Sequence, residues 1–332
     1  MLFNNSASGQ VQGNLYYYFL LYNLFNAPAF LMEYLLMLKN RTKSIVFYGA
    51  TISIFQILAL IIPLVLGYDL STAILIMAMS AFLKFAILSI YVLNAGKPAL
   101  SKSVLKAFGI KALPAILTLI VGGSMQYVDS YIALKFVDKT KFAIYQYGAK
   151  EMPLVMLMAN ALSNVFSGEI AGANLNNNIH GSLQKLKASS KRLMHSLFPI
   201  TILLILCSRF LFVHVYSGGF VGSVSIFNVF MLLTISRLIF PQTIIMALMK
   251  NKTLLKFNSI EWVVNFILDF VFFYYFGLIG IAYATVFSYF LEKVIEVIYL
   301  SRLGYKPADY IPLKAWGFYA AMTISAVIFM GI

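Results

Sequence analysis

Ten long apolar segments constrain this chain more than any other feature of its sequence. They span residues 15–38, 45–66, 70–93, 112–135, 142–166, 194–216, 224–249, 254–276, 278–300 and 312–332. Each holds 21 to 26 residues, which as an α-helix is about 32–39 Å long and crosses a bilayer with some tilt. Because 61% of the 332 residues are apolar and only 11% are charged, a water-soluble fold could not bury them all. The sequence therefore predicts an all-α, polytopic transmembrane helical bundle of about ten helices.

Basic residues in the connections between these segments predict the orientation. Alternate connections, taken as cytoplasmic, hold 17 of them: Lys39, Arg41, Lys43, Lys97, Lys102, Lys106, Lys111, Lys185, Lys187, Lys191, Arg192, Lys250, Lys252, Lys256, Arg302, Lys306 and Lys314. The opposite set holds only Lys135, Lys139 and Lys141. Cytoplasmic connections of membrane proteins are enriched in Lys and Arg, so both ends of the given chain are expected outside.

A basic turn occurs twice, each time after an apolar segment. Lys39-Asn40-Arg41-Thr42 matches Lys250-Asn251-Lys252-Thr253 at an offset of 211 residues. The segment before each turn also contains a proline, Pro28 in the first and Pro241 in the second. Parallel internal repeats are common in transporters, so we interpret the two halves as copies of one unit. The alternative is that two cytoplasmic turns resemble each other by chance.

The repeat predicts a division into domains. Three apolar segments lead up to the second copy of the matching segment, whereas none precedes the first. We therefore expect about 100 further residues, forming three helices, upstream of this sequence. The predicted domains are 1–111, an incomplete N-terminal bundle of three helices; 112–300, a C-terminal six-helix bundle; and 301–332, an extra C-terminal helix.

Three segments carry a resemblance to a known family. They are FAIYQYGAKEMPLVMLMANALSNVF (Phe142–Phe166), GGSMQYVDSYIALKF (Gly122–Phe136) and GLIGIAYATVFSYFLE (Gly277–Glu292). Together with the helix and basic-turn pattern, they resemble the Wzx-type O-antigen and polysaccharide repeat-unit flippases of the multidrug/oligosaccharidyl-lipid/polysaccharide exporter superfamily.

That resemblance implies a function as well as a fold. The fold is a two-bundle repeat in the cytoplasmic (inner) membrane that works by alternating access. The substrate is an oligosaccharide on polyprenyl diphosphate, carried from the cytoplasmic side outward. The expected partners are this lipid-linked substrate, the bilayer and a coupling ion, H⁺ or Na⁺. No cofactor and no covalent chemistry are implied, so the chain is not expected to be an enzyme.

Two basic residues lie near the middle of predicted helices. Lys84 is about 14 residues into its segment and Arg237 about 13, so each is about 20 Å from the outer face at 1.5 Å per residue. They belong to opposite bundles. Ionisable groups at this depth are costly unless they face a cavity or a partner. We interpret both as cavity residues for the diphosphate or an acidic sugar, and arginine suits two-bond phosphate contact. The alternative is an interhelical ion pair.

Four further ionisable residues are candidates. Asp129 and Lys150 are expected at similar depth near the outer ends of antiparallel helices, and they could pair as a gate, an ion site or a static brace. Glu151, beside Lys150, and Asp269, near mid-membrane, are candidates for the coupling ion. A hydrogen bond to a neighbouring helix is the alternative for Asp269.

Five further ionisable residues are expected at the inner ends of helices. They are Glu33, Glu261, Glu292, Lys293 and Glu296. Side chains in such positions extend to interfacial water, so they are expected to be solvated rather than functional.

Other functional classes fit less well. A small-molecule or drug antiporter of the same superfamily would favour few cations and one dominant carboxylate in the cavity. A membrane-embedded polymerase or glycosyltransferase usually has a large extramembrane loop, and no predicted loop here exceeds 27 residues. The formal charge of +14 is dispersed in short groups, which argues against nucleic-acid binding. His180, His195, His214 and Cys207 lack metal-ligand spacing.

Overall fold

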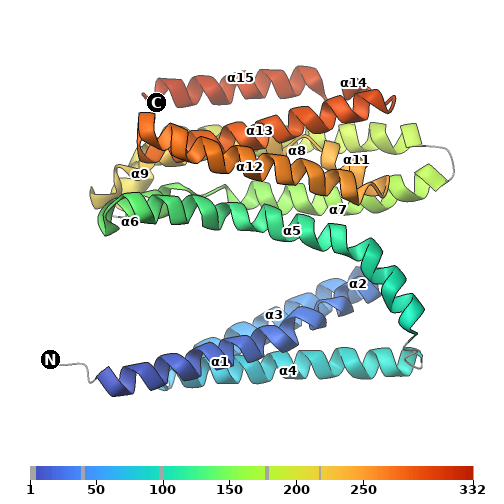
Figure 1. Cartoon of the computed structure of the whole chain (residues 1–332), viewed down its shortest axis with the longest axis vertical. Coiled ribbons are helices and arrows are strands. Elements are labelled where there is room, and N and C mark those ends of the chain that lie inside the picture. The colour runs from blue at the N-terminus through green and yellow to red at the C-terminus, as the bar shows by residue number, and fades with distance from the viewer. Residues whose placement is uncertain (1–4, 39–41, 97–100, 176–178, 217, 332) are drawn as a thin grey trace. The chain divides into compact units, whose positions relative to one another are not determined.

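The computed structural model describes residues 5–38, 42–96, 101–175, 179–216 and 218–331. The described residues are helical apart from short connections (Figure 1). The chain divides into two compact units, Met1–Lys102 and Ser103–Ile332. The predicted domain boundary at residue 111 lies inside one helix, α5 (Lys102–Phe136). The predicted domains stay a prediction.

The Met1–Lys102 unit contains four helices. They are α1 (Asn5–Ala29), α2 (Leu31–Leu38), α3 (Thr42–Val65) and α4 (Leu70–Ala95). α4 packs against both α1 and α3. Of the two predicted matching turns, Lys39, Asn40 and Arg41 lie outside the described residues, so the turn comparison stays a prediction.

The Ser103–Ile332 unit contains α5 and the rest of the chain. Its other elements are α6 (Lys139–Gly148), α7 (Pro153–Leu175), α8 (Ile179–His214), η1 (Gly218–Phe220), α9 (Ser223–Met231), α10 (Leu233–Arg237), α11 (Pro241–Ala247), α12 (Asn251–Phe276), α13 (Leu278–Arg302), α14 (Pro307–Tyr310) and α15 (Leu313–Phe329). α12 and α13 form a hairpin, and α13 also packs against α9, α10 and α11. α8 packs against α7, α9 and α15.

The structure confirms a polytopic helical bundle. Within the described residues, seven helices are long and apolar enough to cross a membrane, and one bent pair makes eight. The seven lie in α3, α4, α5, α7, α8, α12 and α13. α15, predicted as a tenth span, is apolar but has only 17 residues. The predicted span 15–38 is divided between α1 and α2 at Phe30, two residues after Pro28.

Two predicted single helices are wrong because each is interrupted before a proline. The predicted helix 142–166 begins earlier, at Lys139, and is broken between Gly148 and Pro153. The predicted helix 224–249 is broken between α10 and α11, with a bend of 46°. Proline has no backbone N–H, and it disfavours helical geometry in the residue before it. Pro153 and Pro241 accordingly start new helices, α7 and α11.

The start of α6 is fixed by a cap. The Asp138 carboxylate accepts a hydrogen bond from the backbone N–H of Lys141 (2.9 Å). This hydrogen bond lowers the pKa of Asp138 and satisfies one of the free donors at the start of α6.

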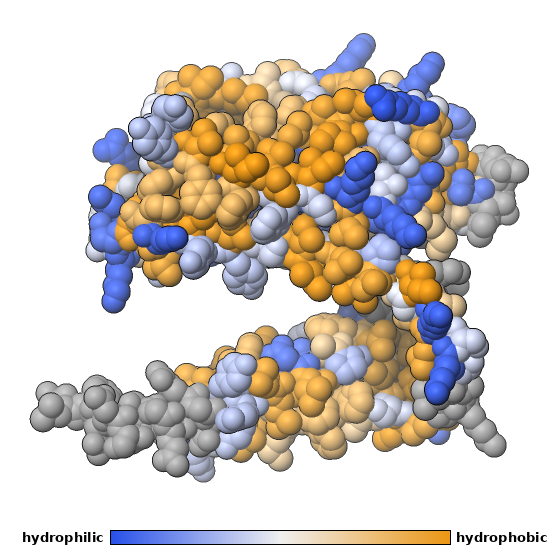
Figure 2. All heavy atoms as spheres, in the orientation of Figure 1, coloured by the Kyte–Doolittle hydropathy of each residue, from blue (hydrophilic) through white to orange (hydrophobic). Residues whose placement is uncertain are grey.

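Apolar side chains form both the core and much of the outer surface. Phe198, Met194 and Ile244 are fully buried in the larger core cluster of the Ser103–Ile332 unit. On the exposed side, Leu119 and Phe329 are 76% and 80% exposed. Figure 2 shows apolar residues over most of the visible flank of this unit, with hydrophilic residues gathered mainly towards its ends. This distribution fits a bundle whose flanks face lipid.

The α12–α13 hairpin depends on glycine. Gly277 forms the whole connection and has φ of 66°, a conformation that favours glycine. A Cβ on Gly280 would overlap the backbone carbonyl of Phe272. We therefore expect Gly280→Ala to separate α12 from α13 and to destabilise the unit by about 1–3 kcal/mol. Thermal unfolding in detergent measures this effect.

Gly317→Ala is the matched control for that measurement. Gly317 is also helical, but nothing lies within 4 Å of a Cβ built on it. Alanine there should be neutral or slightly stabilising, because it lowers the entropy of the unfolded chain. Equal melting temperatures for the two variants would contradict the close packing at Gly280.

Candidate functional site

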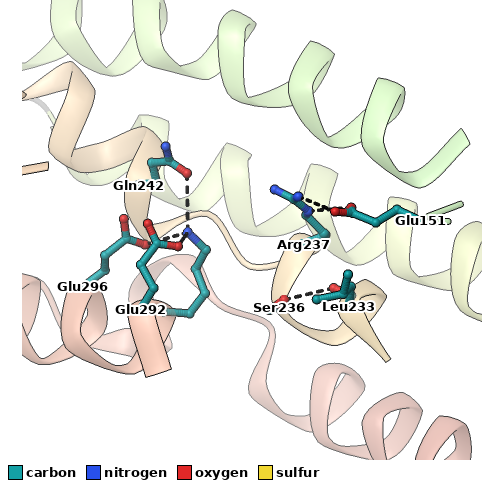
Figure 3. Close-up of polar contacts among 8 residues, drawn as sticks. Glu151, Leu233, Ser236, Arg237, Gln242, Glu292 and Glu296 are labelled. Atoms are coloured by element: carbon teal, nitrogen blue, oxygen red, sulfur yellow. Dashed lines mark hydrogen bonds and ion pairs between the residues drawn. The ribbon is translucent and has the colours of Figure 1, made fainter. Parts of the chain in front are cut away.

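An ion pair joins the two helix breaks of the Ser103–Ile332 unit. Arg237 is the last residue of α10, and Glu151 lies in the gap between α6 and α7. The Arg237 guanidinium donates from Nε to Glu151 Oε2 (2.9 Å) and from Nη2 to Glu151 Oε1 (2.7 Å) (Figure 3). Such two-bond geometry requires arginine and is stronger than a single neutral hydrogen bond. The pair therefore ties one interrupted helix to the other.

The same contacts define the surroundings of Arg237. Its side chain is 23% exposed and that of Glu151 is 12% exposed. Its guanidinium carbon lies 4.5 Å from the centre of the Tyr289 ring on α13, within the range of a cation–π interaction. Arg237 thus has the interhelical ion pair that was the alternative to cavity lining. Glu151, a candidate for the coupling ion, is its partner.

A cavity of about 240 Å³ adjoins the α6–α7 break. Its lining includes Asp129 from α5, Lys150 and Glu151 from the break, and Thr285 and Tyr289 from α13. The structure therefore brings three of the predicted site residues to one cavity. Thr285 and Tyr289 were not predicted.

The predicted Asp129–Lys150 pair is not formed. Asp129 is only 4% exposed, and other helices supply its hydrogen bonds. Lys150 is exposed, and no ion pair joins it to any described residue. The prediction placed Lys150 by counting residues along a continuous helix, and the break before Pro153 invalidates that count.

Asp129 instead belongs to a network that connects three helices. Its Oδ1 accepts from Asn265 Nδ2 of α12 (2.7 Å), and its Oδ2 accepts from Thr285 Oγ1 of α13 (2.8 Å). Asn265 Nδ2 also lies 3.2 Å from Asp269 Oδ2. Asp269 is fully buried, and neither its Oδ1 nor the Asn265 Oδ1 has a hydrogen-bond partner. The buried Asp269 carboxyl group and the Asn265 amide thus each present an unsatisfied oxygen beside the Asp129 carboxylate.

The Met1–Lys102 unit holds the remaining candidate, Lys84. This side chain is 3% exposed, and its Nζ lies 3.4 Å from Asn26 Oδ1 and 4.0 Å from the centre of the Phe30 ring. Gln56 donates to the same Asn26 oxygen (3.2 Å). No ion pair to Lys84 is formed within the described residues. A role for Lys84 together with Arg237 stays a prediction.

Four residues expected to reach water are buried instead. Glu261, Glu292, Lys293 and Glu296 are each 5% exposed or less. They lie on the facing surfaces of the α12–α13 hairpin rather than on its lipid side. Spacing provided a signal: polar residues of α12 recur at 258, 261, 265 and 269, and those of α13 at 285, 289, 292 and 296. Such intervals place residues on one helix face.

Comparisons with known proteins support the fold. No protein-family model and no curated protein matches the chain. A solved structure, described as "Lipid II flippase MurJ, inward closed conformation", matches with a TM-score of 0.53 and 19% sequence identity. The match covers 84% of this chain, and the chain spans 58% of that protein. The chain therefore shares its fold with a solved lipid flippase.

Proposed function

We propose that the chain translocates an oligosaccharide linked to polyprenyl diphosphate across the cell membrane by alternating access. The observation that carries this proposal is the meeting of two interrupted helices beside a cavity that Asp129, Lys150 and Glu151 line. Transporters commonly bind substrates and ions where membrane helices are discontinuous. The fold of a lipid II flippase supports a lipid-linked substrate. The sequence resemblance suggests the repeat unit of an O-antigen or a capsule.

The cationic side chains fit an anionic head group. Lys150 is exposed at the cavity, so its ammonium group is available to a phosphate. Arg237 is held by Glu151. A diphosphate that competes with Glu151 for the guanidinium would loosen the contact between the two helix breaks. We assign a similar phosphate-binding role to Lys84 in the Met1–Lys102 unit.

The coupling ion would bind at the network of Asp129, Asn265, Asp269 and Thr285. The partnerless oxygens of Asp269 and Asn265 could be satisfied by a proton on a carboxyl group or by Na⁺. Thr285 and Asp129 also line the cavity. Ion binding and substrate binding would therefore involve one set of helices.

A transport assay tests the proposed function. Lys150→Ala should lower the rate at which reconstituted chain moves a fluorescent polyprenyl-diphosphate oligosaccharide, by about tenfold for the loss of one charge-assisted contact of about 1.5 kcal/mol. The same variant should fail to restore surface polysaccharide in a flippase-deficient strain. Lys185→Ala, which removes an exposed ammonium paired with Glu169, is the matched control.

The second candidate function, a drug antiporter, gives a different result. The Asp129 and Glu151 carboxylates at the cavity would suit a cationic small molecule. In that case the wild-type chain would export cationic dyes and would leave the lipid-linked oligosaccharide in its original leaflet. That outcome would contradict the flippase proposal.

A further inference from the structure

A buried ion cluster lies on α13, towards the end of the α12–α13 hairpin that is remote from Gly277. The Lys293 ammonium donates to Glu292 Oε2 (2.7 Å) and to Glu296 Oε2 (3.0 Å), and its Nζ is 3.4 Å from Gln242 Oε1 of α11. Figure 3 shows Glu292, Glu296 and Gln242 converging. One ammonium group thus holds two carboxylates inside the bundle.

A third carboxyl group approaches this cluster from α12. Glu261 is 3% exposed, and its Oε1 has no hydrogen-bond partner. Asn258, three residues earlier on the same face of α12, contacts the cluster directly. In the side-chain orientation that satisfies its amide group, the Asn258 amide nitrogen donates to Glu292 Oε1 (3.2 Å). Glu261 also interacts electrostatically with Glu292, Lys293 and Glu296 of this cluster, and with Arg237 of α10.

Two more buried polar atoms near the cluster lack partners. They are Glu296 Oε1 and the hydroxyl of Tyr310 on α14. Burial and the nearby Glu296 carboxylate raise the pKa of Tyr310, so the phenol is neutral at physiological pH. Unpartnered buried polar atoms are rare in folded proteins and call for an explanation.

The charges of the cluster do not balance. Three carboxylates, Glu261, Glu292 and Glu296, face one ammonium, which would leave a net charge of −2 if every group were ionised. Among the described helices packed on α13, α9 and α11 carry no charged side chain. α10 supplies Arg237, whose charge also acts on Glu261 but is balanced by its bond to Glu151, and α14 supplies Asp309 and the neutral Tyr310. α12 adds Lys252 and Lys256, which are exposed, and Asp269, which belongs to the network of Asp129.

A buried charge that is not compensated is strongly unfavourable. Among the described residues, no three His, Cys, Asp or Glu side chains are arranged to hold a metal ion. A proton is therefore the cation that fits: it forms an O–H bond on a carboxylate oxygen, removes one negative charge and converts an acceptor into a donor.

We propose that Glu261, Glu292 and Glu296 form a proton-binding site around Lys293, distinct from the network of Asp129 and Asp269. The proton enters from water as a carboxylate becomes a carboxylic acid, and it returns to water by the reverse step. About two protons are needed to balance the four groups. This site deepens the proposed transport function, because it supplies a place where a proton gradient acts.

The position of Gln242 suggests how such a site acts on the cavity. Gln242 is the second residue of α11, and Arg237 is the last residue of α10, across the same break. The two side chains contact different clusters, Gln242 at Lys293 and Arg237 at Glu151. Protonation that rearranges the partners of Lys293 would therefore act on a bent helix pair that also holds the α6–α7 break.

Infrared spectroscopy of the full chain in lipid nanodiscs tests the proton site without any transport measurement. The chain, labelled with ¹³C at the glutamate carboxyl carbon, should show the C=O stretch of protonated glutamic acid at pH 7. Glu261→Gln should reduce that band by roughly half, since it removes one of about two bound protons. Glu169→Gln, at a partly exposed ion pair, should leave the band unchanged.

Two results would overturn the proposal. One is an unchanged band in Glu261→Gln. The other is the absence of the protonated glutamic acid band from the wild-type chain between pH 6 and pH 8. This second result does not depend on whether any variant folds. An intact band together with no flippase activity would contradict the proposed function and leave the proton site standing.

Discussion

Arg237→Ala should both destabilise the protein and stop transport. The substitution leaves the Glu151 carboxylate, 12% exposed, without its guanidinium partner at the junction of two helix breaks. Removing one member of a buried pair costs about 3–5 kcal/mol, and partial solvent access lowers this to about 2–4 kcal/mol. Thermal unfolding in detergent measures the stability, and the proteoliposome assay measures transport.

A double-mutant cycle separates the pair from its two members. The double variant Arg237→Ala/Glu151→Ala also removes the unpaired Glu151 carboxylate. It should therefore be about 1–3 kcal/mol more stable than Arg237→Ala alone. The double variant should nevertheless remain inactive, because it lacks both the ion pair between the two helix breaks and the guanidinium group. Arg302→Ala, at the exposed end of α13, is the control for loss of a positive charge. An unchanged melting temperature for Arg237→Ala would show that the pair contributes nothing to the fold.

Hydropathy predicted most of the spans but none of the breaks. Segments such as 45–66, 70–93 and 254–276 became α3, α4 and α12 because their composition alone requires lipid or core contact. Averaging over 20 residues hides a local backbone interruption, so 142–166 and 224–249 were predicted as continuous helices. Pro153 and Pro241 were the local signals for the interruptions.

The sequence identified residues of the candidate site but did not identify which residues contact one another. Asp129, Lys150 and Glu151 were identified because ionisable groups are rare at membrane depth, and all three line one cavity. The partners of Asp129 were not identified, because Asn265 and Thr285 come from helices far along the chain. Which residues pair depends on how the helices pack, and a single sequence does not specify this.

Position along the helix also gave the wrong expectation for the exposure of the buried acidic cluster. Glu261 and Glu296 lie near helix ends, so they were expected to reach interfacial water. The face of the helix decides the outcome instead: both residues point into the α12–α13 contact, where they are at most 3% exposed. For charged residues near the ends of membrane helices, the spacing of polar neighbours is a better guide than the distance to the end.

Asp269→Asn should abolish the response of the protein to its coupling ion. Asp269 and Asp129 are both buried, and a single amide nitrogen, that of Asn265, contacts both carboxyl groups. An ion that binds only the folded protein at 100 times its Kd raises the unfolding free energy by about 2.7 kcal/mol. If the network binds Na⁺, the melting temperature of the wild-type chain should rise with the Na⁺ concentration. If it binds a proton, the melting temperature should rise as the pH is lowered. Asp269→Asn removes a charged ligand, so it should lose the rise with Na⁺ and keep only the part of the pH response that the Glu261, Glu292 and Glu296 site supplies.

The arms of this experiment identify the ion. Titration with NaCl against KCl at fixed pH isolates Na⁺, and titration of pH in KCl isolates the proton. Asp138→Asn is the matched control, since asparagine caps α6 about as well as aspartate does and the residue is exposed. A wild-type protein whose stability follows neither ion, or an Asp269→Asn variant that responds as wild type does, would remove the network from the coupling mechanism. Because Glu261→Gln leaves the Asp129–Asp269 network intact, a response to Na⁺ that survives in that variant would show that the two sites bind different ions.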